Sequence, residues 1–471
     1  MAATPNKMPT VMTSSLERLG ATSSRVKITI PKEWNAEASC KVSLHRRWLG
    51  IYAPKVDETQ QGHQPGVTPY LEGVTVLDFT QYLAGPSCTR LLVEMGADVI
   101  KVEYPPYGDP VRPSPPRRNG RSAYHVQQNR GKRSLSVDLT RSEGVSLIED
   151  LIPKVDIVVE NYSPGVMERR GLGYSRLREL NPQIIMASIS GFGQSGPLSE
   201  KTAFDFIAQA YSGLMHMTGE PDGPPMLIGA GIADTSTGVH AFAALGYALY
   251  RRDRTGEGSH LDIAMVDVMY HMQESAVSGP SLSPDEAVGM RTGRHYAPAS
   301  PAGIFKGPEE WIVVFALENQ ISNLWTALGQ PELADDPRFT NNRTRLENRD
   351  ALTKIIEDWM AKFDNDKEVV ATLEEHRVPC GPVVEPVKLA ETHPHFLERG
   401  TVREVTDPLA GSMLIPGFPL RFSDAPDLPD LVAAEVGEHN QSVLEDLLAM
   451  DARSVAALEQ DGILYRRPPR T

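Results

Sequence analysis

The sequence predicts an α/β fold in which helices cover both faces of a parallel sheet and a smaller mixed domain follows. From residue 71 onward, short apolar strand patterns alternate with helix patterns, which is typical of β-α-β units. After about residue 277, a loop-rich stretch precedes a second group of strands and helices. The length of 471 residues exceeds that of one typical hydrophobic core, which indicates two domains or one large domain with an insertion.

The large domain is expected to open with a β-α-β unit. "VTVLDFT" (74–80) is a buried-strand pattern, "PSCTRLLVEMG" (86–96) is a helix closed by glycine, and "DVIKVE" (98–103) is the next strand. The alternation continues through a strand at 133–139, a helix at 142–152, a strand at 156–161, a helix at 175–181 and a strand at 183–190.

The pattern beyond residue 190 predicts the rest of the large domain and the smaller one. A helix with a polar turn at 240–260 precedes a strand at 261–266 and a helix through about residue 276. After the loop-rich stretch come "GIFKG", "EWIVVFAL", and the helices "NQISNLWTALG" and "RDALTKIIEDWMAKF". The last eighty residues combine "TVREVTD" and "SMLIPGFPLRFSD" with one final helix, "EHNQSVLEDLLAM".

Composition excludes several classes of protein. The formal charge of −14 and a pI near 5.4 argue against a broad nucleic-acid surface, so any anion site is expected to be local. No apolar run approaches the length of a membrane span, so we expect no membrane partner. Cys40, Cys88 and Cys380 lie far apart, and neither they nor the 12 histidines follow a ligand spacing, so no metal is predicted.

The first seventy residues differ from the rest. Residues 1–55 carry nine Lys or Arg and only three acidic residues, and they are rich in Ser, Thr and Ala, as mitochondrial presequences are. Glu17, Glu33 and Glu37 interrupt the basic pattern, so an extension that stays on the protein is the other interpretation. We therefore expect a cytoplasmic protein, with the mitochondrial matrix as the alternative.

Two glycine-rich or basic motifs are weak candidates for phosphate binding. "GFGQSG" (191–196) matches G-x-G-x-x-G formally, but the following "PLSEKTAF" does not predict the helix that a dinucleotide fingerprint requires. Arg130, Lys132 and Arg133 form a basic group that fits phosphate or a solvated turn. No G-x-S-x-G elbow, H-E-x-x-H or P-loop occurs.

The carboxylate in "GAGIADTSTGVH" (229–240) permits two interpretations. Asp234 stands just before the predicted helix, where it would be an N-cap kept in its charged form by the helix terminus. A charged carboxylate is also what a carboxylate nucleophile requires. Local pattern alone leaves both interpretations open.

Six dispersed segments resemble the class III CoA-transferases. They are "VLDFTQYLAGPSCTRLLVEMGADVIKVEYPPYGDPVR", "NRGKRSLSVDL", "DIVVENYSPGVMERRGL", "GEPDGPPMLIGAGIADTSTGVH", "RTGEGSHLDIAMVD" and "VPCGPV". The similarity runs in order over roughly residues 71–465. Formyl-CoA:oxalate and carnitine CoA-transferases belong to this family, and α-methylacyl-CoA racemase is related to it.

The resemblance implies a fold and a mechanism. The large domain would be Rossmann-like, and two subunits would interlock as a homodimer. Asp234 would attack an acyl-CoA thioester, forming first an aspartyl anhydride and then an aspartyl-CoA thioester that passes CoA to a small carboxylic acid. Coenzyme A would enter as a thioester substrate, with no further cofactor.

The resemblance also implies positions that contact CoA. They lie after the first strand, on "VDLT", after "VVEN", before the nucleophile and near the thioester: Tyr82, Leu83, Ala84, Val137, Asn161, Tyr162, Ser163, Arg169, Lys201, Asp205 and Met265.

Some positions depart from the family pattern. Leu83 replaces a glutamine and Tyr104 an arginine of the formyl-CoA enzyme, and "GRHYAPASPAGIF" replaces its glycine-rich segment, which argues against formyl-CoA and oxalate as substrates. Phe204 stands where the racemase branch has a histidine, so a two-base proton transfer would lack one base. Racemase or isomerase activity is the alternative, and a CoA-binding protein without catalysis is a third hypothesis.

We accordingly divide the chain into five parts. They are an N-terminal extension (1–70), the first part of the large Rossmann-like domain (71–277), a linker (278–302), a small domain (303–383), and a second linker that returns to the large domain (384–471).

Overall fold

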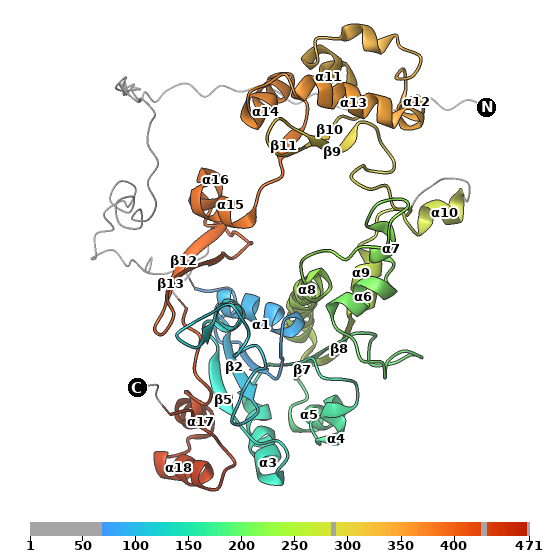
Figure 1. Ribbon diagram of the computed structural model, residues 1–471. Coiled ribbons are helices and arrows are strands. Elements are labelled where there is room, and N and C mark those ends of the chain that lie inside the picture. Colours follow the sequence, from blue (N-terminus) through green and yellow to red (C-terminus); the bar gives the residue numbers. More distant parts are fainter. Residues whose placement is uncertain (1–67, 284–288, 425–430, 469–471) are drawn as a thin grey trace, which may run out of the picture. The chain divides into compact units, whose positions relative to one another are not determined.

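The computed structural model of the chain describes residues 68–283, 289–424 and 431–468, and most of its elements are labelled in Figure 1. The predicted N-terminal extension therefore lies almost wholly outside the described residues. The main sheet has six parallel strands, which are in spatial order β5 (Arg133–Ser136), β2 (Asp98–Glu103), β1 (Thr75–Asp78), β6 (Ile157–Glu160), β7 (Ile185–Ser190) and β8 (Ser259–Ala264). All six strands occur where the sequence predicts them.

The strand order reverses direction between β1 and β6. From β1 the chain adds β2 and β5 on one side, and then returns to place β6, β7 and β8 on the other. In open parallel sheets the connections leave such a reversal in opposite directions, so a crevice opens beyond the carboxyl ends of the two strands, and ligands bind there. A ligand site is therefore expected at the segments that follow β1 and β6.

Helices cover both faces of this sheet, as predicted. Val76 and Leu77 are consecutive residues of β1 that point to opposite faces, and both are fully buried. One face packs on α1 (Ala84–Glu94), α8 (Ile232–Thr255) and α9 (Met265–His271). The other face packs on α3 (Ser142–Leu151), α5 (Tyr174–Leu180), α17 (Asn440–Leu448) and α18 (Ala452–Gln460).

The end of the chain carries two helices where one was predicted. Ala449 adopts a left-handed conformation (φ 52°) and ends α17. Asp451 then starts α18, because its side chain accepts a hydrogen bond from the Ser454 amide at 2.8 Å. Both helices contribute buried residues to the sheet core, so the C-terminal segment packs on the same sheet as the N-terminal strands.

Helix α8 begins at Ile232, eight residues before the predicted start. Thr235, Ser236 and Thr237 look like turn residues, but each hydroxyl donates to the carbonyl four residues earlier, at 2.6–2.7 Å. Small residues on this turn also allow close packing on α1: a Cβ added to Gly238 would lie 2.6 Å from the Ala84 carbonyl oxygen. Tertiary packing thus overrides the low helix propensity of "DTSTG".

A second, antiparallel sheet has its own hydrophobic core. Its strands are β9 (Ala302–Lys306), β10 (Trp311–Phe315) and β11 (Cys380–Pro382). Its helices are α11 (Ile321–Ala327), α12 (Asn342–Glu347), α13 (Arg349–Met360) and α14 (Asp366–Glu375), with a 3-10 turn at Pro331–Ala334. Phe305, Trp325, Phe339 and Trp359 are the buried aromatic members of that core.

The remaining elements are short. They are β3 (Arg117–Arg118), β4 (Arg121–Ser122), α2 (Ala123–Asn129), the 3-10 turn Ile152–Lys154, α4 (Val166–Arg169), α6 (Asp205–Tyr211), α7 (Leu214–Met217), α10 (Ser278–Leu282), α15 (Pro386–Thr392), α16 (Pro394–Glu398), β12 (Val402–Asp407) and β13 (Gly411–Pro416). The helix predicted to run to about residue 276 ends at His271, and α10 lies within the stretch predicted as loop.

Candidate active site

Asp234 is not the N-cap of α8, which corrects one of the two sequence interpretations. It is the third residue of the helix, and Gly231 occupies the cap position without a side-chain bond. The Asp234 amide donates instead to the Asp205 carboxylate, N to Oδ2, at 3.0 Å. Asp205, the first residue of α6, therefore satisfies a free amide at the start of α8 and leaves the Asp234 carboxyl available for other contacts.

The carboxylate of Asp205 is itself firmly held. Its residue is 7% exposed, and its Oδ1 accepts a hydrogen bond from Gln209 Nε2 at 2.6 Å, one turn along α6. Because the second oxygen binds the Asp234 amide, both oxygens of Asp205 have partners on two different helices. The resemblance implies a CoA contact here, and the structure adds a role in holding α8.

Burial raises the pKa of Asp234 from 3.8 to about 7, and the charge of Asp205 acts in the same direction. This contradicts the expectation that the helix terminus keeps Asp234 fully charged. A helix N-terminus favours a carboxylate by about 0.3–1 kcal/mol, which is less than one pKa unit. Desolvation and the neighbouring carboxylate outweigh it, so near neutral pH the free protein holds Asp234 in both protonation states.

The segment after β1 approaches Asp234 from the other side. Leu83 lies against Gly231, because a Cβ added to that glycine would be 2.6 Å from Leu83 Cδ2. The Tyr82 ring meets the ring of Phe204, the residue before Asp205, edge to face at 5.9 Å between centroids. Tyr82, Leu83 and Asp205, three of the implied CoA positions, are thus gathered at the first turn of α8, while Ala84 begins α1 beside them.

Tyr124 lies close enough to Asp234 to be affected by its charge, and the sequence analysis did not name it. It lies on α2, and burial together with the charges of Asp234, Asp109 and Asp205 raises the pKa of its phenol above the usual range. The hydroxyl therefore remains a proton donor at any physiological pH. No local pattern identifies it, since 110 positions separate it from Asp234.

The segment after β6 lies across the strand-order reversal from the segment after β1. Both amide atoms of the Asn161 side chain bind the Gln81 backbone at 2.8 Å. The Tyr162 amide donates to Glu160 Oε2 at 2.8 Å, and Tyr162 packs on the sheet core. Ser163 and Arg169 are exposed and so present their side chains to solvent.

Three other implied CoA positions do not expose a free functional group at Asp234. Val137 is fully buried in the sheet core, so it offers no side-chain surface to a ligand. Lys201 Nζ donates to the Tyr211 hydroxyl at 2.8 Å. Met265 is buried in a small cluster with Ala233, the residue before Asp234, so it packs against the start of α8.

The basic group that the sequence suggested as a phosphate site or a solvated turn is neither. Arg130 is fully buried and paired with Glu94, and Lys132 Nζ lies 3.0 Å from Asp78 Oδ2. Arg133 pairs with Asp98. Arg130 and Lys132 thus neutralise buried carboxylates, whereas Arg133 takes part in a partly exposed ion pair, so each of the three cations already has a carboxylate partner. "GFGQSG" also lacks a phosphate-binding helix, because the described residues that follow it enter no helix before Asp205.

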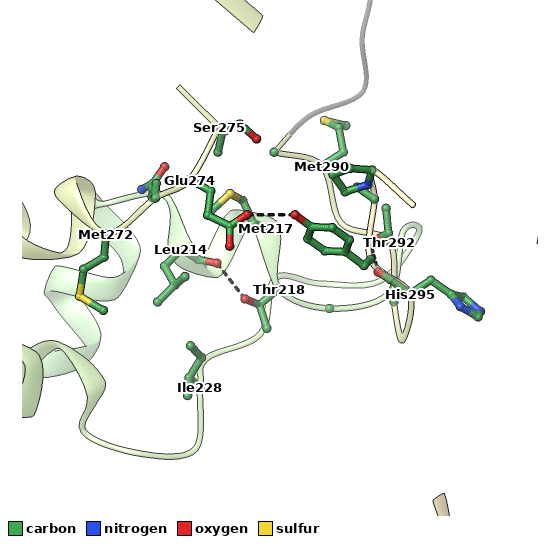
Figure 2. A pocket seen from close by; sticks show the side chains of 18 of the residues that line it. Leu214, Met217, Thr218, Ile228, Met272, Glu274, Ser275, Met290, Thr292 and His295 are labelled. Carbon is green, nitrogen blue, oxygen red and sulfur yellow. Dashed lines mark hydrogen bonds between the residues drawn. The ribbon is translucent and has the colours of Figure 1, made fainter. Parts of the chain in front are cut away.

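A cavity of about 490 Å³ lies near the segment that leads into α8 (Figure 2). Its lining is largely apolar and includes Met217, Met272 and Met290, with Ile228 and Ile232 from the approach to α8. Asp234, Asp205 and Tyr82 are not among its lining residues. The cavity is therefore adjacent to the candidate site along the chain but is not built around the carboxyl.

Two features are absent from residues 68–283, 289–424 and 431–468. No group of three or more His, Cys, Asp or Glu side chains there is arranged to hold a metal ion. None of the helices in these ranges combines the length and the apolar character that a membrane crossing requires.

Comparisons with known proteins agree with the resemblance. A family model described as CoA-transferase family III matches residues 71–440. The chain is 36% identical over 399 residues to the succinyl-CoA–D-citramalate CoA-transferase of Chloroflexus aurantiacus, covering 84% of this chain and 98% of that protein. It is 34% identical over 398 residues to the human succinyl-CoA:glutarate CoA-transferase, with 84% and 90% covered. A crystal structure of a CAIB/BAIF family protein from Brucella suis superposes with a TM-score of 0.71 at 34% identity, covering 81% of this chain and all of that one.

Proposed function

We propose that this chain, which belongs to CoA-transferase family III, moves coenzyme A from an acyl-CoA to a carboxylic acid with Asp234 as the nucleophile. The observation that carries the proposal is the position of Asp234 in the first turn of α8, with its own amide bound to Asp205 and its carboxyl not used for capping. The reversal of strand order between β1 and β6 places the crevice of the sheet at the neighbouring segments.

The proposed reaction proceeds through two kinds of covalent intermediate. The ionised Asp234 attacks the thioester carbonyl carbon, the carbon–sulfur bond breaks, and CoA leaves as a thiolate, which gives a mixed anhydride. The thiolate then attacks the Asp234 carbonyl, releases the donor acid and forms an aspartyl-CoA thioester. The acceptor carboxylate attacks this thioester, which releases the CoA thiolate and forms a second mixed anhydride. The thiolate then attacks the acceptor carbonyl of that anhydride, forms the new acyl-CoA and releases the Asp234 carboxylate. Dividing one transfer into these steps lowers each barrier.

The surroundings of Asp234 suit this chemistry. A carboxyl whose pKa is raised to about 7 has a more basic, and so more nucleophilic, oxygen when it is ionised. Tyr124 keeps its proton and lies within the electrostatic reach of the same carboxyl. We propose that its hydroxyl donates a hydrogen bond to the negative charge that develops on the thioester oxygen.

The residues implied to contact CoA fall into an exposed group and a group that is buried or partly buried. Tyr82, Ser163, Arg169 and Lys201 are exposed and are the candidates for direct contact. The other implied positions shape the walls of the site or hold its segments: Leu83, Ala84, Val137, Asn161, Tyr162, Asp205 and Met265. CoA enters as a substrate, and we propose no further cofactor and no metal.

We propose a dicarboxylic acid and its CoA ester as the substrate class. Both relatives described above are named as succinyl-CoA-dependent transferases. Leu83 and Tyr104 depart from the formyl-CoA enzyme, which argues against formyl-CoA and oxalate. A racemase function is not favoured, because Phe204 precedes Asp205 where that branch has a histidine and because the named relatives are transferases.

We further propose that the active protein is an interlocked homodimer. The described chain leaves several large apolar side chains of α6, α8 and α9 exposed, among them Phe206, Tyr247, Tyr250 and Tyr270. Exposed apolar patches on this scale commonly mark interfaces.

Replacing Asp234 by asparagine tests the nucleophile. The side chain is nearly isosteric, so the fold should remain, while transfer is expected to fall by at least about a thousand-fold because the covalent step is lost. Turnover is measured by mass spectrometry of the exchanged thioesters from a panel of acyl-CoA donors and carboxylate acceptors. Hydroxylamine added to the wild-type protein with donor should convert the activated Asp234 carboxyl to a hydroxamate.

Asp267 provides the matched control. It is the third residue of α9, as Asp234 is of α8, but it is exposed. Asp267→Asn should keep nearly all activity. Near wild-type transfer by Asp234→Asn, or a hydroxamate located on another residue, would overturn the proposed mechanism. The same panel identifies the donor and acceptor acids, and a preference for monocarboxylates would overturn the proposed substrate class.

A further inference from the structure

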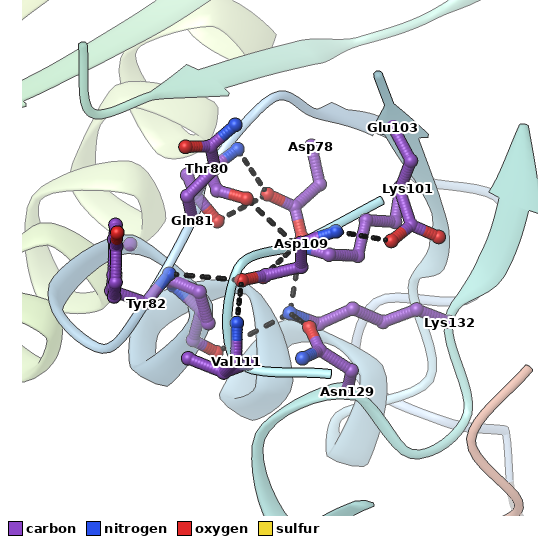
Figure 3. Close-up of polar contacts among 12 residues, drawn as sticks. Asp78, Thr80, Gln81, Tyr82, Lys101, Glu103, Asp109, Val111, Asn129 and Lys132 are labelled. Carbon is purple, nitrogen blue, oxygen red and sulfur yellow. Dashed lines mark hydrogen bonds and ion pairs between the residues drawn. The ribbon is translucent and has the colours of Figure 1, made fainter. Parts of the chain in front are cut away.

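The backbone of Thr80–Tyr82 is held by side chains throughout. The Thr80 amide donates to Asp78 Oδ1 at 2.9 Å, and the Thr80 carbonyl accepts from Lys101 Nζ at 2.7 Å. The Gln81 amide and carbonyl both bind the Asn161 side chain, and the Tyr82 amide donates to Asp109 Oδ1 at 3.3 Å. Figure 3 shows Asp78, Lys101 and Asp109 gathered around this segment. Five consecutive backbone groups thus depend on four side chains from different parts of the chain.

The flanks of the segment are anchored in the buried interior. Lys101 and Asp109 are each 2% exposed, and Lys101 Nζ lies 2.9 Å from Asp109 Oδ2. One ion pair therefore holds the Thr80 carbonyl through its cation and the Tyr82 amide through its anion. Tyr82 needs such restraint, because its φ of 63° is a left-handed conformation that non-glycine residues rarely adopt.

Among the four side chains that hold Thr80–Tyr82, that of Asn161 is the only neutral one. It links the segment after β6 to the segment after β1, on the two sides of the strand-order reversal. Asn161 directly follows β6, whereas Gln81 is the third residue after the end of β1. The side-chain oxygen accepts from the Gln81 amide and the side-chain nitrogen donates to the Gln81 carbonyl, each at 2.8 Å. This arrangement reproduces a pair of strand-to-strand hydrogen bonds beyond the point where the two strands separate.

The held segment leads to the start of α8, the helix that carries Asp234. Leu83 lies against Gly231, the cap residue of α8, and the Tyr82 ring meets Phe204. Phe204 adjoins Asp205, whose carboxylate binds the Asp234 amide. A displacement of Gln81 would therefore move the wall that faces the first turn of α8.

We propose that Asn161 is a positioning residue of the transfer reaction: by clamping Gln81 it holds residues 80–83 against the first turn of α8, and its side chain does not bind CoA. The proposal rests on the proposed function, because it assigns Asn161 to the Asp234 reaction. It replaces the direct CoA contact that the resemblance implies for this side chain, both of whose polar atoms already bind Gln81.

The kinetic constants of an Asn161 variant distinguish a positioning role from a CoA-binding role. A side chain that contacts CoA equally before and during the reaction lowers KM, and its removal raises KM while kcat stays unchanged. A side chain that aligns the wall beside Asp234 acts on the reacting geometry, where small misplacements cost up to about 10²-fold. Asn161→Ala is therefore expected to lower kcat by about 10- to 100-fold with little change in the KM for acyl-CoA.

Amide hydrogen exchange provides a readout that needs no catalysis. In Asn161→Ala the Gln81 amide loses its acceptor, so its exchange should accelerate by at least about tenfold, while the amides of β1 keep their protection. Ser163→Ala gives the kinetic comparison, because this exposed neighbour is a candidate CoA contact whose loss should change KM and not kcat.

Asn161→Asp keeps the proposal testable if the alanine variant does not fold. An ionised aspartate turns a second acceptor towards the Gln81 carbonyl, whereas a protonated one donates there as the amide does. The ratio of its kcat to that of the wild type should therefore rise as the pH falls. Asn319→Asp, which adds the same charge at an exposed position, should show a flat ratio.

Three results would overturn the proposal. They are a raised KM with unchanged kcat in Asn161→Ala, unchanged exchange of the Gln81 amide, and a flat pH ratio for Asn161→Asp. None of them bears on the nucleophile, which stands or falls with Asp234→Asn.

Discussion

At the scale of single residues, the site depends on two carboxylates with different tasks. Asp205 has partners for both oxygens and holds the start of α8, whereas the Asp234 carboxyl is half-buried beside it. The cost of keeping Asp234 ionised appears as a pKa of about 7. Burial raises this pKa, the charge of Asp205 adds to the effect, and the same surroundings make the ionised oxygen a stronger nucleophile.

This pair predicts how activity depends on pH. Raising the pH ionises Asp234, so kcat/KM should increase through about pH 7 and then level off, because this parameter reports the free protein. Asp205→Asn removes the neighbouring negative charge and should shift the midpoint to lower pH while keeping one hydrogen bond to the start of α8. Initial rates over a pH series at low acyl-CoA concentration measure both midpoints.

An unchanged midpoint in Asp205→Asn would mean that burial alone sets the pKa of Asp234. A profile that falls with rising pH would contradict an ionised carboxylate as the attacking group.

At the scale of elements, the approach of α1 to α8 decides where the site lies. Gly238 lets the two helices meet, since an added Cβ would be 2.6 Å from the Ala84 carbonyl oxygen and 2.7 Å from Ser87 Cβ. Helix α1 starts at Ala84, directly after the segment that faces Asp234. Close packing therefore fixes the distance between that segment and the nucleophile.

Two glycines of α8 are predicted to respond in opposite ways to alanine. Gly238→Ala forces backbone and side chains apart, and should lower the free energy of unfolding by about 1–3 kcal/mol. Gly246 lies on the same helix, and a Cβ added there would meet no atom within 4 Å. Gly246→Ala should therefore raise the free energy of unfolding by about 0.5–1 kcal/mol through helix propensity. Chemical denaturation of both variants measures the difference, and equal effects would contradict the packing argument.

The elements also show where sequence reasoning reaches its limit. The strands of the main sheet were predictable, because buried parallel strands are short and largely apolar, as in "QIIMASIS" (183–190). The start of α8 was not, because Thr235, Ser236 and Thr237 satisfy their hydroxyls within the helix. Asp451 had a readable cap pattern, so the second C-terminal helix could have been predicted.

At the scale of the whole molecule, the proposed homodimer has a direct test. Sedimentation equilibrium should give a mass of twice 51.7 kDa, with no dissociation on dilution, because interlocked subunits must partly unfold to separate. The same protein run without crosslinker under denaturing conditions gives the mass of the single chain as the control. A monomer at every concentration would contradict the proposal, and a dimer that dissociates readily would contradict the interlocking.

The sequence by itself determined the alternation of strands and helices, the parallel sheet and the family, because these depend on apolar periodicity and on motifs that are local in the chain. Only the tertiary structure decided the state and the neighbours of Asp234. Its pKa depends on burial and on Asp205, 29 positions earlier, and its surroundings include Tyr124 and the segment clamped by Asn161. The segments of Gln81 and Asn161 meet because the strand order reverses between β1 and β6, and the pKa of Asp234 is set through space because desolvation and charge do not act along the chain.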